Sequence, residues 1–192
     1  MTKIIGLTGG IGSGKTTVAN YLLEKNIPVY IADDEARKIT NSKKVIDKIV
    51  AIFGNEVLKN SKIDRAALAK IVFKDKEKLA QLNAIIHPEV KKHFKKWLKS
   101  KLDYKFVVKE SAILFESGSY KDCDAIILVT APLEVRIERT MKRDKIDRES
   151  VLQRINNQMS EEEKIKKSDY IIQNNYLKDT HSQLDNLLKN FK

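Results

Sequence analysis

The chain has 192 residues, of which 42% are hydrophobic and 33% are charged, and it carries a formal net charge of +11. This length and composition predict one domain, residues 1–192, with a hydrophobic core, and they exclude a disordered, collagen-like or peptide-sized chain. The longest apolar run, residues 125–129, is much shorter than the roughly 18 apolar residues that a membrane helix requires, so we expect no membrane span.

The cysteine content predicts the redox environment of the chain, and the net charge predicts the classes of partner that it binds. Its single cysteine, Cys123, cannot form an intramolecular disulfide, so we expect a reducing, cytoplasmic environment. The positive charge favours a polyanionic partner: nucleic acid, a membrane surface or a phosphorylated small molecule. Charge alone does not choose among these three classes.

The N-terminal part of the chain predicts a strand, a glycine-rich loop, a helix and a second strand. Residues 3–8 form a short apolar run that ends in glycines, and residues 16–24 have apolar side chains at helical spacing. Residues 28–32 predict the second strand, and Asp33 follows it as a candidate helix N-cap.

The remainder predicts a long helical block and three further strands. All signals over residues 43–101 are helical, with Asp64 as the N-cap of a helix over residues 66–73. Strand patterns return at residues 105–109, 125–130 and 170–173. Because strands alternate with helices, we expect an α/β fold with a parallel sheet that is covered on both faces.

One helix of this block is expected to be strongly basic. Five lysines occupy one side of it, at positions 91, 92, 95, 96 and 99, opposite an apolar stripe that includes Phe94 and Trp97. A solvated surface face explains this pattern. The alternatives are steering of an anionic substrate and weak, non-specific binding of nucleic acid.

A glycine-rich motif carries the chemistry. Residues 9–16, GGIGSGKT, match GxxxxGKS/T between a predicted strand and a predicted helix, which is the context of a phosphate-binding loop. The backbone N–H groups of such a loop bind phosphate oxygens, and Lys15 would reach the β and γ phosphates of a nucleotide. The Thr16 hydroxyl would bind Mg²⁺. A glycine-rich turn without a ligand is the alternative, and it leaves the flanking strand and helix unexplained.

Phosphate loops occur in switches, motors and kinases. A guanine-nucleotide switch would be expected to carry Asp-x-x-Gly and Asn/Thr-Lys-x-Asp motifs, and neither occurs in this sequence. Motors and DNA translocases are usually much longer chains. A sequence-specific nucleic-acid module would leave the phosphate loop unexplained, and no helix-turn-helix, RNA-recognition or zinc-finger pattern accompanies the charge. The sequence therefore favours a small-molecule kinase.

Five of the seven arginines cluster in one stretch: Arg136, Arg139, Arg143, Arg148 and Arg154. The first three are spaced i, i+3, i+7, so they share one face if Pro132 starts a helix. Planar guanidinium groups bind phosphate oxygens in pairs and stabilise a phosphoryl group during its transfer. The alternative is a solvated helix with salt bridges to Glu134 and Glu138.

Several further motifs follow the phosphate loop. They are Ala32-Asp33 with Ala36-Arg37, LNAIIHP at residues 82–88, ILFE at 113–116, RTMKRD at 139–144 and DYIIQNN at 169–175. Together with the loop in the form LTGGIGSGKTTV, and in this order and spacing, they resemble the dephospho-CoA kinase family over nearly the full length of the chain.

The resemblance implies ATP-dependent phosphorylation of the 3′-hydroxyl of the ribose of dephospho-CoA, the last step of coenzyme A synthesis, with Mg²⁺ as cofactor. It implies a P-loop kinase fold like that of nucleoside monophosphate kinases. That fold has a five-stranded parallel sheet, a helical substrate-binding insertion at about residues 38–103 and a lid at about residues 139–158. The protein would be a monomer or a homotrimer, with ATP and dephospho-CoA rather than specific nucleic acid or membrane as partners. Another small-metabolite or nucleoside monophosphate kinase is the alternative.

The family motifs also assign roles to individual residues. Catalysis would depend on Lys15, Asp33, Arg139 and Arg143. The nucleotide would be bound by Gly9, Gly10, Ile11, Gly12, Ser13, Gly14, Lys15, Thr16, Thr17 and Asn174, and Mg²⁺ by Thr16. The acceptor would be bound by Thr8, Asp33, Arg37, Arg65, His87 and Glu116, although a packing role for His87 and a solvated position for Arg65 are the simpler alternatives.

Two positions depart from the family's pattern. The family commonly shows Asp-Ala-Asp after the second strand, and the first of these positions is Ile31 in this chain. Asp33 is then the family-matched carboxylate that remains to take the proton of the acceptor hydroxyl, with a plain helix cap as its alternative role. Ala112 replaces a common proline, which removes no reactive group, and Glu110 is a further candidate for contacts with water or metal.

Overall fold

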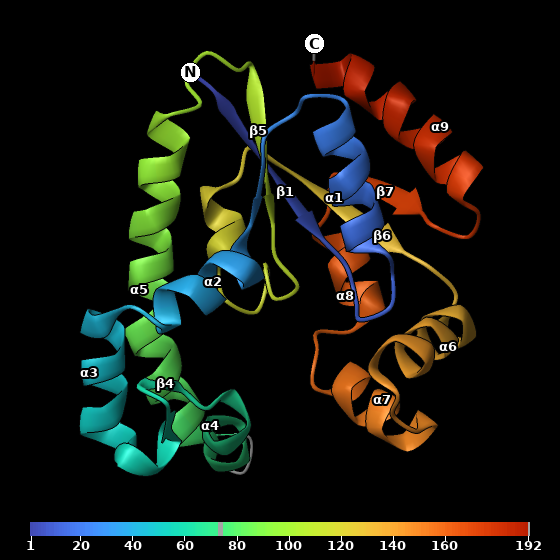
Figure 1. The fold of residues 1–192 in the computed structure, drawn as a ribbon. Coiled ribbons are helices and arrows are strands. Elements are labelled where there is room, and N and C mark those ends of the chain that lie inside the picture. Colours follow the sequence, from blue (N-terminus) through green and yellow to red (C-terminus); the bar gives the residue numbers. More distant parts are fainter. Residues whose placement is uncertain (73–74, 192) are drawn as a thin grey trace. The chain divides into compact units, whose positions relative to one another are not determined.

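The computed structural model describes residues 1–72 and 75–191 and divides into two compact units (Figure 1). The first unit consists of Met1–Ile31 and Lys101–Lys192, and the second is Ala32–Ser100. The second unit is therefore inserted between two segments of the first in the sequence, and it includes most of the stretch that we expected as the helical insertion. Among the described residues, no helix is long and apolar enough to cross a membrane.

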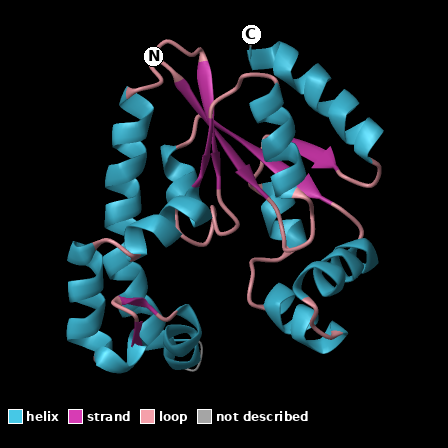
Figure 2. Ribbon diagram, in the orientation of Figure 1, coloured by secondary structure: helices cyan, strands magenta, loops and turns pink. Residues whose placement is uncertain are grey.

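A five-stranded parallel sheet in the order β2-β5-β1-β6-β7 forms the centre of the first unit (Figure 2). Its strands are β1 (Lys3–Thr8), β2 (Val29–Ile31), β5 (Phe106–Glu110), β6 (Ala125–Thr130) and β7 (Tyr170–Gln173). In the register, Leu7 of β1 lies beside Glu110 of β5 and Ile127 of β6. The predicted fold class is confirmed. Because the strands are parallel, their carboxyl ends share one edge, and β1 continues there into the glycine-rich loop.

Both faces of this sheet are covered, which explains why its central strands are mostly apolar. Helices α1 (Lys15–Glu24) and α9 (Leu177–Leu188) pack on one face, where Leu22 and Leu184 are fully buried in a cluster with Ile5 and Leu7. On the other face, Leu114 and Phe115 form a second cluster with Ile126 of β6. Helix α8 (Glu161–Lys166) also contacts β6.

Two helices lie between β6 and α8 in the chain. Helix α6 (Leu133–Asp144) begins directly after Pro132, as the sequence predicts, and α7 (Arg148–Asn156) follows it with Asp147 as N-cap. The Asp147 carboxylate accepts a hydrogen bond from the backbone N–H of Ser150 at 2.7 Å. Short 3₁₀ helices occupy Ser119–Asp122 and Lys189–Phe191.

The second unit is mainly helical. It contains α2 (Ala32–Thr40), α3 (Lys43–Phe53), a 3₁₀ turn (Asn55–Val57), the strands β3 (Leu58–Lys59) and β4 (Lys62–Ile63), α4 (Arg65–Val72) and α5 (Lys76–Lys99). Its core includes Val45, Ile49, Phe53 and Leu68.

The expectation of an entirely helical block over residues 43–101 is wrong at the β3–β4 hairpin. Asn60 and Ser61 have positive φ angles of 51° and 59°, so a two-residue turn reverses the chain there. Two-residue strands are too short to show a period in the sequence, which is why this hairpin was not predicted. Asp64 does cap α4, because its carboxylate accepts the N–H groups of Ala66 and Ala67 at 2.9 and 3.1 Å. The last residue of that predicted helix, Phe73, lies outside the described residues.

Candidate active site around the phosphate loop

The loop between β1 and α1 has the backbone of a phosphate-binding loop. Gly14 occupies the N-cap position of α1 in the left-handed conformation, with φ of 93°, and no side chain caps the helix there. Gly12 also has a positive φ, 77°. Glycine adopts these angles without strain, and the N–H groups of the first turn of α1 are left for a ligand. The structure thus agrees with the motif.

Side chains from distant parts of the chain hold the loop in this shape. Arg136 Nε of α6 donates to the carbonyl of Ile11 at 3.0 Å. Asn174 Nδ2, directly after β7, donates to the carbonyl of Ser13 at 2.8 Å, and its Oδ1 accepts from the Thr180 hydroxyl at 2.9 Å. A Cβ at Gly12 would collide with the backbone of Arg136, and one at Gly14 would collide with the Asn174 amide. These glycines therefore also permit close packing from outside.

Lys15 lies back over its own loop. Its Nζ donates to the carbonyl of Gly9 at 2.8 Å and is 3.5 Å from that of Gly10. These two contacts place the ammonium group over the backbone of the loop. The hydroxyls of Thr8 and Ser13 are buried and have no hydrogen-bond partner within the described part of the chain. Buried hydroxyl groups are usually hydrogen-bonded, so this arrangement suits an oxygen-rich ligand.

The residues near the loop fit Mg²⁺ bound through phosphate. Thr16 is exposed in the first turn of α1, and its hydroxyl has no hydrogen-bond partner among the described residues. The described residues contain no group of three His, Cys, Asp or Glu side chains that could hold a metal ion by themselves. Mg²⁺ commonly keeps several waters and uses one or two protein oxygens together with substrate phosphates. One hydroxyl at the loop is consistent with that mode.

The five clustered arginines divide into two groups. Arg136 is buried and forms an ion pair with Glu161, and Arg139 donates to the carbonyl of Asn174 at 3.1 Å, so both act on the surroundings of the phosphate loop. The other three form exposed ion pairs: Arg143 and Arg154 with Asp144, and Arg148 with Glu134. The Arg148–Glu134 pair agrees with the alternative of solvated salt bridges, whereas the partner of Arg143 and Arg154 is Asp144 and not the expected Glu138.

Asp144 takes part in two of these ion pairs, with Arg143 and with Arg154. The hydrogen bond from Arg143 lowers the pKa of the Asp144 carboxyl, and the same hydrogen bond raises the pKa of Arg143. Both groups are therefore charged at neutral pH. A role of Arg143 in phosphoryl transfer would require its guanidinium to leave Asp144, so this role stays a prediction.

The segment from α7 to α8 joins the loop to the rest of the first unit. Gln158 Oε1 accepts a hydrogen bond from the backbone N–H of Ile11 at 2.9 Å, and the N–H of Met159 donates to Glu116 at 3.0 Å. Lys164 forms an ion pair with the same Glu116 oxygen at 3.3 Å. Sequence reasoning assigned no role to Gln158 or Lys164. Lys164 stands in a lysine-rich stretch where no pattern separates it from its neighbours.

Four of the expected acceptor-site residues belong to the second unit. Asp33 is exposed and lies in the first turn of α2, which begins at Ala32, so its expected alternative as an N-cap is not what the structure shows. Arg37 pairs with Asp34 at 3.2 Å, and Arg65 is exposed at the start of α4. His87 is partly buried in α5, and this burial lowers the pKa of its imidazole. Its neutral form is thereby favoured.

The first unit combines a five-stranded parallel sheet, a phosphate loop after its central strand and two helices that follow β6, the first of which contacts the loop. These features define the chain as a P-loop kinase. The model of the dephospho-CoA kinase family matches residues 3–179. The chain belongs to this family.

Individual relatives agree with that membership. The dephospho-CoA kinase of Fusobacterium nucleatum is 48% identical over 187 residues, which are 97% of this chain and 93% of the relative. The crystal structure of TT1252 from Thermus thermophilus is 36% identical with a TM-score of 0.91, over 100% of this chain and 98% of that one. The dephospho-CoA kinase structure from Campylobacter jejuni is 30% identical with a TM-score of 0.73, over 98% and 96% of the two chains. The similarity thus extends over the whole length.

Proposed function

We propose that this chain transfers the γ-phosphoryl group of ATP to the 3′-hydroxyl of the ribose of dephospho-CoA, which gives coenzyme A and ADP in the cytoplasm. The observation that carries the proposal is the phosphate loop at the carboxyl end of β1, held by Arg136 and Asn174, in a chain that matches the dephospho-CoA kinase family over residues 3–179.

The phosphate loop would serve the breaking of the bond between the γ-phosphorus and the β,γ-bridging oxygen. Negative charge then grows on the departing ADP. Loop N–H groups and the Lys15 ammonium would stabilise that charge, with Lys15 exchanging the carbonyls of Gly9 and Gly10 for phosphate oxygens. Mg²⁺, bound through Thr16 and phosphate oxygens, would offset charge on the β and γ phosphates.

The acceptor side would be served by Asp33 and the lid arginines. A bond forms between the 3′-oxygen and the γ-phosphorus while the hydroxyl proton passes to the Asp33 carboxylate. Arg139 and Arg143 of α6 would bind the transferring phosphoryl oxygens, for which a planar guanidinium group is well suited. Thr8, Arg37, Arg65, His87 and Glu116 remain the residues proposed to bind the acceptor.

An acceptor panel tests this function. The chain is assayed with Mg-ATP and dephospho-CoA, nucleoside monophosphates, shikimate or gluconate, and products are identified by mass. We expect phosphorylation of dephospho-CoA, and activity confined to another acceptor would overturn the proposal.

The matched control is Lys15→Ala, which excludes a contaminating kinase. Removal of this charge should lower kcat by about two orders of magnitude or more, the cost typical of losing one donor to a transition state. A Lys15→Ala variant within a few-fold of the unmodified chain would contradict the role of the loop lysine.

A further inference from the structure

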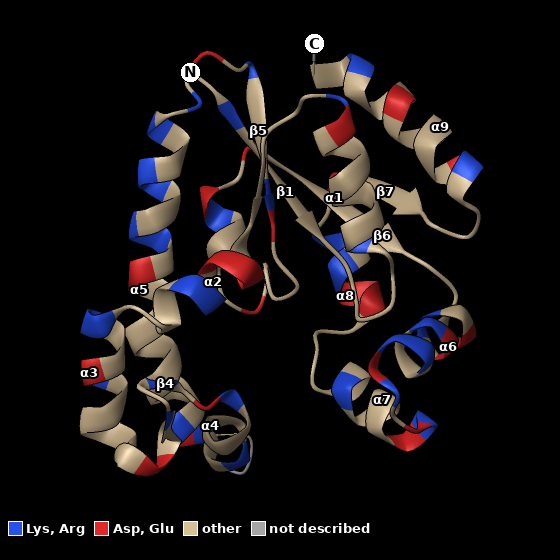
Figure 3. Cartoon of the chain, viewed as in Figure 1, with Lys and Arg blue, Asp and Glu red and all other residues tan. Residues whose placement is uncertain are grey.

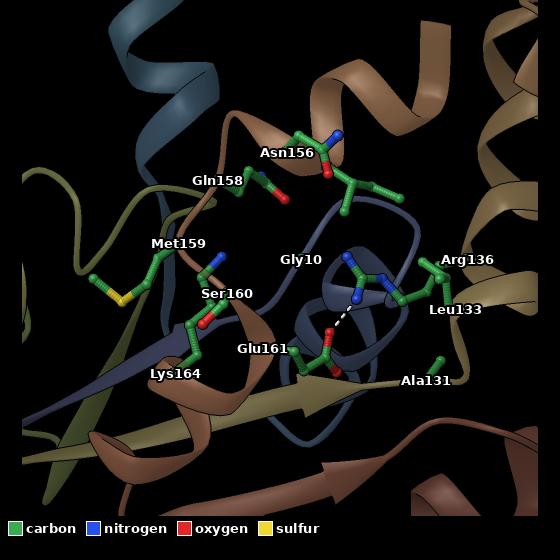
Figure 4. Close-up of a pocket in the computed structure, with 11 residues that line it drawn as sticks. Gly10, Ala131, Leu133, Arg136, Asn156, Gln158, Met159, Ser160, Glu161 and Lys164 are labelled. Carbon is green, nitrogen blue, oxygen red and sulfur yellow. Dashed lines mark hydrogen bonds and ion pairs between the residues drawn. The ribbon is translucent and has the colours of Figure 1, made fainter. Parts of the chain in front are cut away.

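A cavity of about 590 Å³ lies beside the phosphate loop in the first unit (Figure 4). Gly10 contributes one wall, and α6, the end of α7 and α8 contribute the others. Its polar lining consists of Arg136, Asn156, Gln158, Ser160, Glu161 and Lys164. Two of these six side chains are cationic and one is anionic. The cavity therefore combines apolar and charged residues, and its two cationic side chains each have an anionic partner, Glu161 for Arg136 and Glu116 for Lys164.

Lys164 is the least satisfied of these groups. Its side chain is 2% exposed, and it is one of the α8 residues that line the cavity (Figure 4). Its Nζ has no hydrogen-bond partner within the described part of the chain. The nearby Glu116 oxygen, 3.3 Å away, makes an ion pair with it and also accepts the N–H of Met159. An ammonium group has three donors, and burying a charge is costly unless it is both paired and hydrogen-bonded.

Two other polar groups of the cavity, Arg136 and Gln158, are already engaged with the loop. Arg136 donates to the carbonyl of Ile11 and pairs with Glu161. Gln158 covers the N–H of Ile11 with a neutral amide oxygen at 2.9 Å. The Gln158 amide, which accepts a loop N–H, and the incompletely hydrogen-bonded Lys164 ammonium therefore line one cavity. An anionic oxygen satisfies such donors better than a neutral one, because charge-assisted hydrogen bonds are about twice as strong.

We propose that Lys164 binds a phosphoryl oxygen in this cavity, as a binding residue in addition to Lys15. In this arrangement Glu116 holds the ammonium in place without using its donors, and the arriving oxygen completes its hydrogen bonds. The phosphoryl oxygen would come from the terminal phosphoryl group of ATP or from the diphosphate of dephospho-CoA. The inference rests on the proposed function, because that function names these two ligands.

Lys164→Met tests the proposal, because methionine keeps the length and removes the charge. Lys166→Met is the matched control, since Lys166 is an exposed lysine of the same helix. Dissociation constants for Mg-ATP, Mg-ADP and dephospho-CoA are measured by calorimetry, together with the melting temperature. We expect Lys164→Met to weaken binding of ATP or of dephospho-CoA roughly 10- to 100-fold, the loss expected for one hydrogen bond to a charged group. Lys166→Met should bind as the unmodified chain does.

The pattern of losses identifies the source of the phosphoryl oxygen. If it is the terminal phosphoryl of the donor, the Kd for Mg-ATP rises and that for Mg-ADP does not. If it is the acceptor diphosphate, the Kd for dephospho-CoA rises and both nucleotide constants stay unchanged. Should the unmodified chain neither bind nor phosphorylate dephospho-CoA, the proposed function fails. The ATP and ADP constants then still decide the role of Lys164.

A double-mutant cycle with Glu116→Gln separates binding from a purely structural ion pair. If Lys164 only neutralises Glu116, its replacement in the Glu116→Gln background has no effect on any dissociation constant. If Lys164 binds a phosphoryl oxygen, the loss persists in that background. The proposal is overturned if Lys164→Met keeps all three constants, or if the double variant binds as tightly as Glu116→Gln alone. The double variant decides the matter where Lys164→Met has a lowered melting temperature, because it leaves no unpaired carboxylate behind.

Discussion

Asp33 is the residue that we propose as the base for the acceptor hydroxyl. It is exposed, it follows β2 by two residues and it lies inside the first turn of α2 rather than at its N-cap. Ile31 occupies the place of the family's other carboxylate. At the scale of single residues, the proposed acceptor chemistry therefore depends on the one carboxylate of Asp33.

Asp33→Asn should reduce kcat by roughly 10² to 10⁴, because general base catalysis contributes about that much. The loose transition state of phosphoryl transfer is the reason to expect residual activity. The Kd for Mg-ATP should stay near its original value, and the melting temperature should change little. An unchanged kcat, or a kcat that falls only as far as the folded fraction falls, would contradict the role of Asp33 as base. Glu110 or a bound water would then be the candidate base.

Cys123 should be an unreactive thiol in the folded chain. Burial raises its pKa from 9.0 to about 11, so the thiolate is about 100-fold rarer near neutral pH than in the unfolded chain. We expect alkylation by iodoacetamide at pH 8 to be slower in the folded chain than in urea by about that factor.

The pH dependence of Cys123 checks the sign of this shift. Because the buried thiol has a higher pKa than the thiol of the unfolded chain, the protonated thiol is compatible with the folded state at pH values below about 9. As the pH rises from about 9 to about 11, the unfolded chain loses this proton before the folded chain does, and the stability of the folded state falls. Alkylation of the folded chain should therefore accelerate over this range. Equal rates in the folded and unfolded chains at pH 8 would show that the thiol is not buried.

At the scale of elements, the phosphate loop is held by segments that are distant in the chain. Helix α6 reaches it through Arg136, the α7–α8 connection through Gln158 and the residue after β7 through Asn174. Each contact uses a backbone group of the loop, so the loop's shape depends on the packing of three separate segments. Asn174 was expected to contact the nucleotide, whereas its amide in this structure is bonded at both ends to protein.

Asn174→Ala should therefore weaken the fold as well as the binding of nucleotide. Loss of both hydrogen bonds leaves the Ser13 carbonyl and the Thr180 hydroxyl with fewer partners, which costs about 1–3 kcal/mol. We expect a lower melting temperature and similar losses of affinity for ATP and for tripolyphosphate, which has no base.

Asn175→Ala is the control for this variant, because Asn175 is exposed next to it. Its melting temperature should not change. If Asn174→Ala kept its melting temperature and its affinity for tripolyphosphate while it lost affinity for ATP, Asn174 would be a contact to adenine instead.

The net charge of +11 belongs to the whole molecule rather than to one patch. Lys and Arg occur on helices of both units, including α5 and α6 (Figure 3). The five lysines of the predicted basic helix are all exposed on α5, opposite the buried Phe94, as the sequence predicts. Dispersed charge of this kind acts on anionic substrates at a distance, within the range that salt leaves unscreened.

Ionic strength should therefore affect the rate at which the protein and its anionic substrate associate more than the rate of phosphoryl transfer. We expect kcat/KM for dephospho-CoA to fall several-fold between about 0.05 M and about 0.5 M salt, while kcat changes much less. Potassium chloride and choline chloride at equal ionic strength separate screening from inhibition by a particular cation. A kcat/KM that is insensitive to salt would contradict steering, and tight binding of duplex DNA at physiological salt would favour the nucleic-acid alternative.

Local features of this protein followed from the sequence alone. The strands at residues 3–8, 125–130 and 170–173 have the predicted bounds, and the phosphate loop lies where its motif placed it. These features depend on residues adjacent in the chain: apolar runs, glycines that allow positive φ and a proline that starts a helix. Neighbouring residues are enough to specify them.

Only the tertiary structure decided which side chains serve the loop. Ile11 and Gln158 are 147 positions apart in the chain, and Ser13 and Asn174 are 161 apart, so no local pattern relates them. The division of the arginines between loop contacts and surface ion pairs, and the burial of Lys164 among exposed lysines, have the same origin. The type of a residue determines the charge of its side chain, whereas the burial and the partners of that side chain depend on how the sheet and the helices pack together.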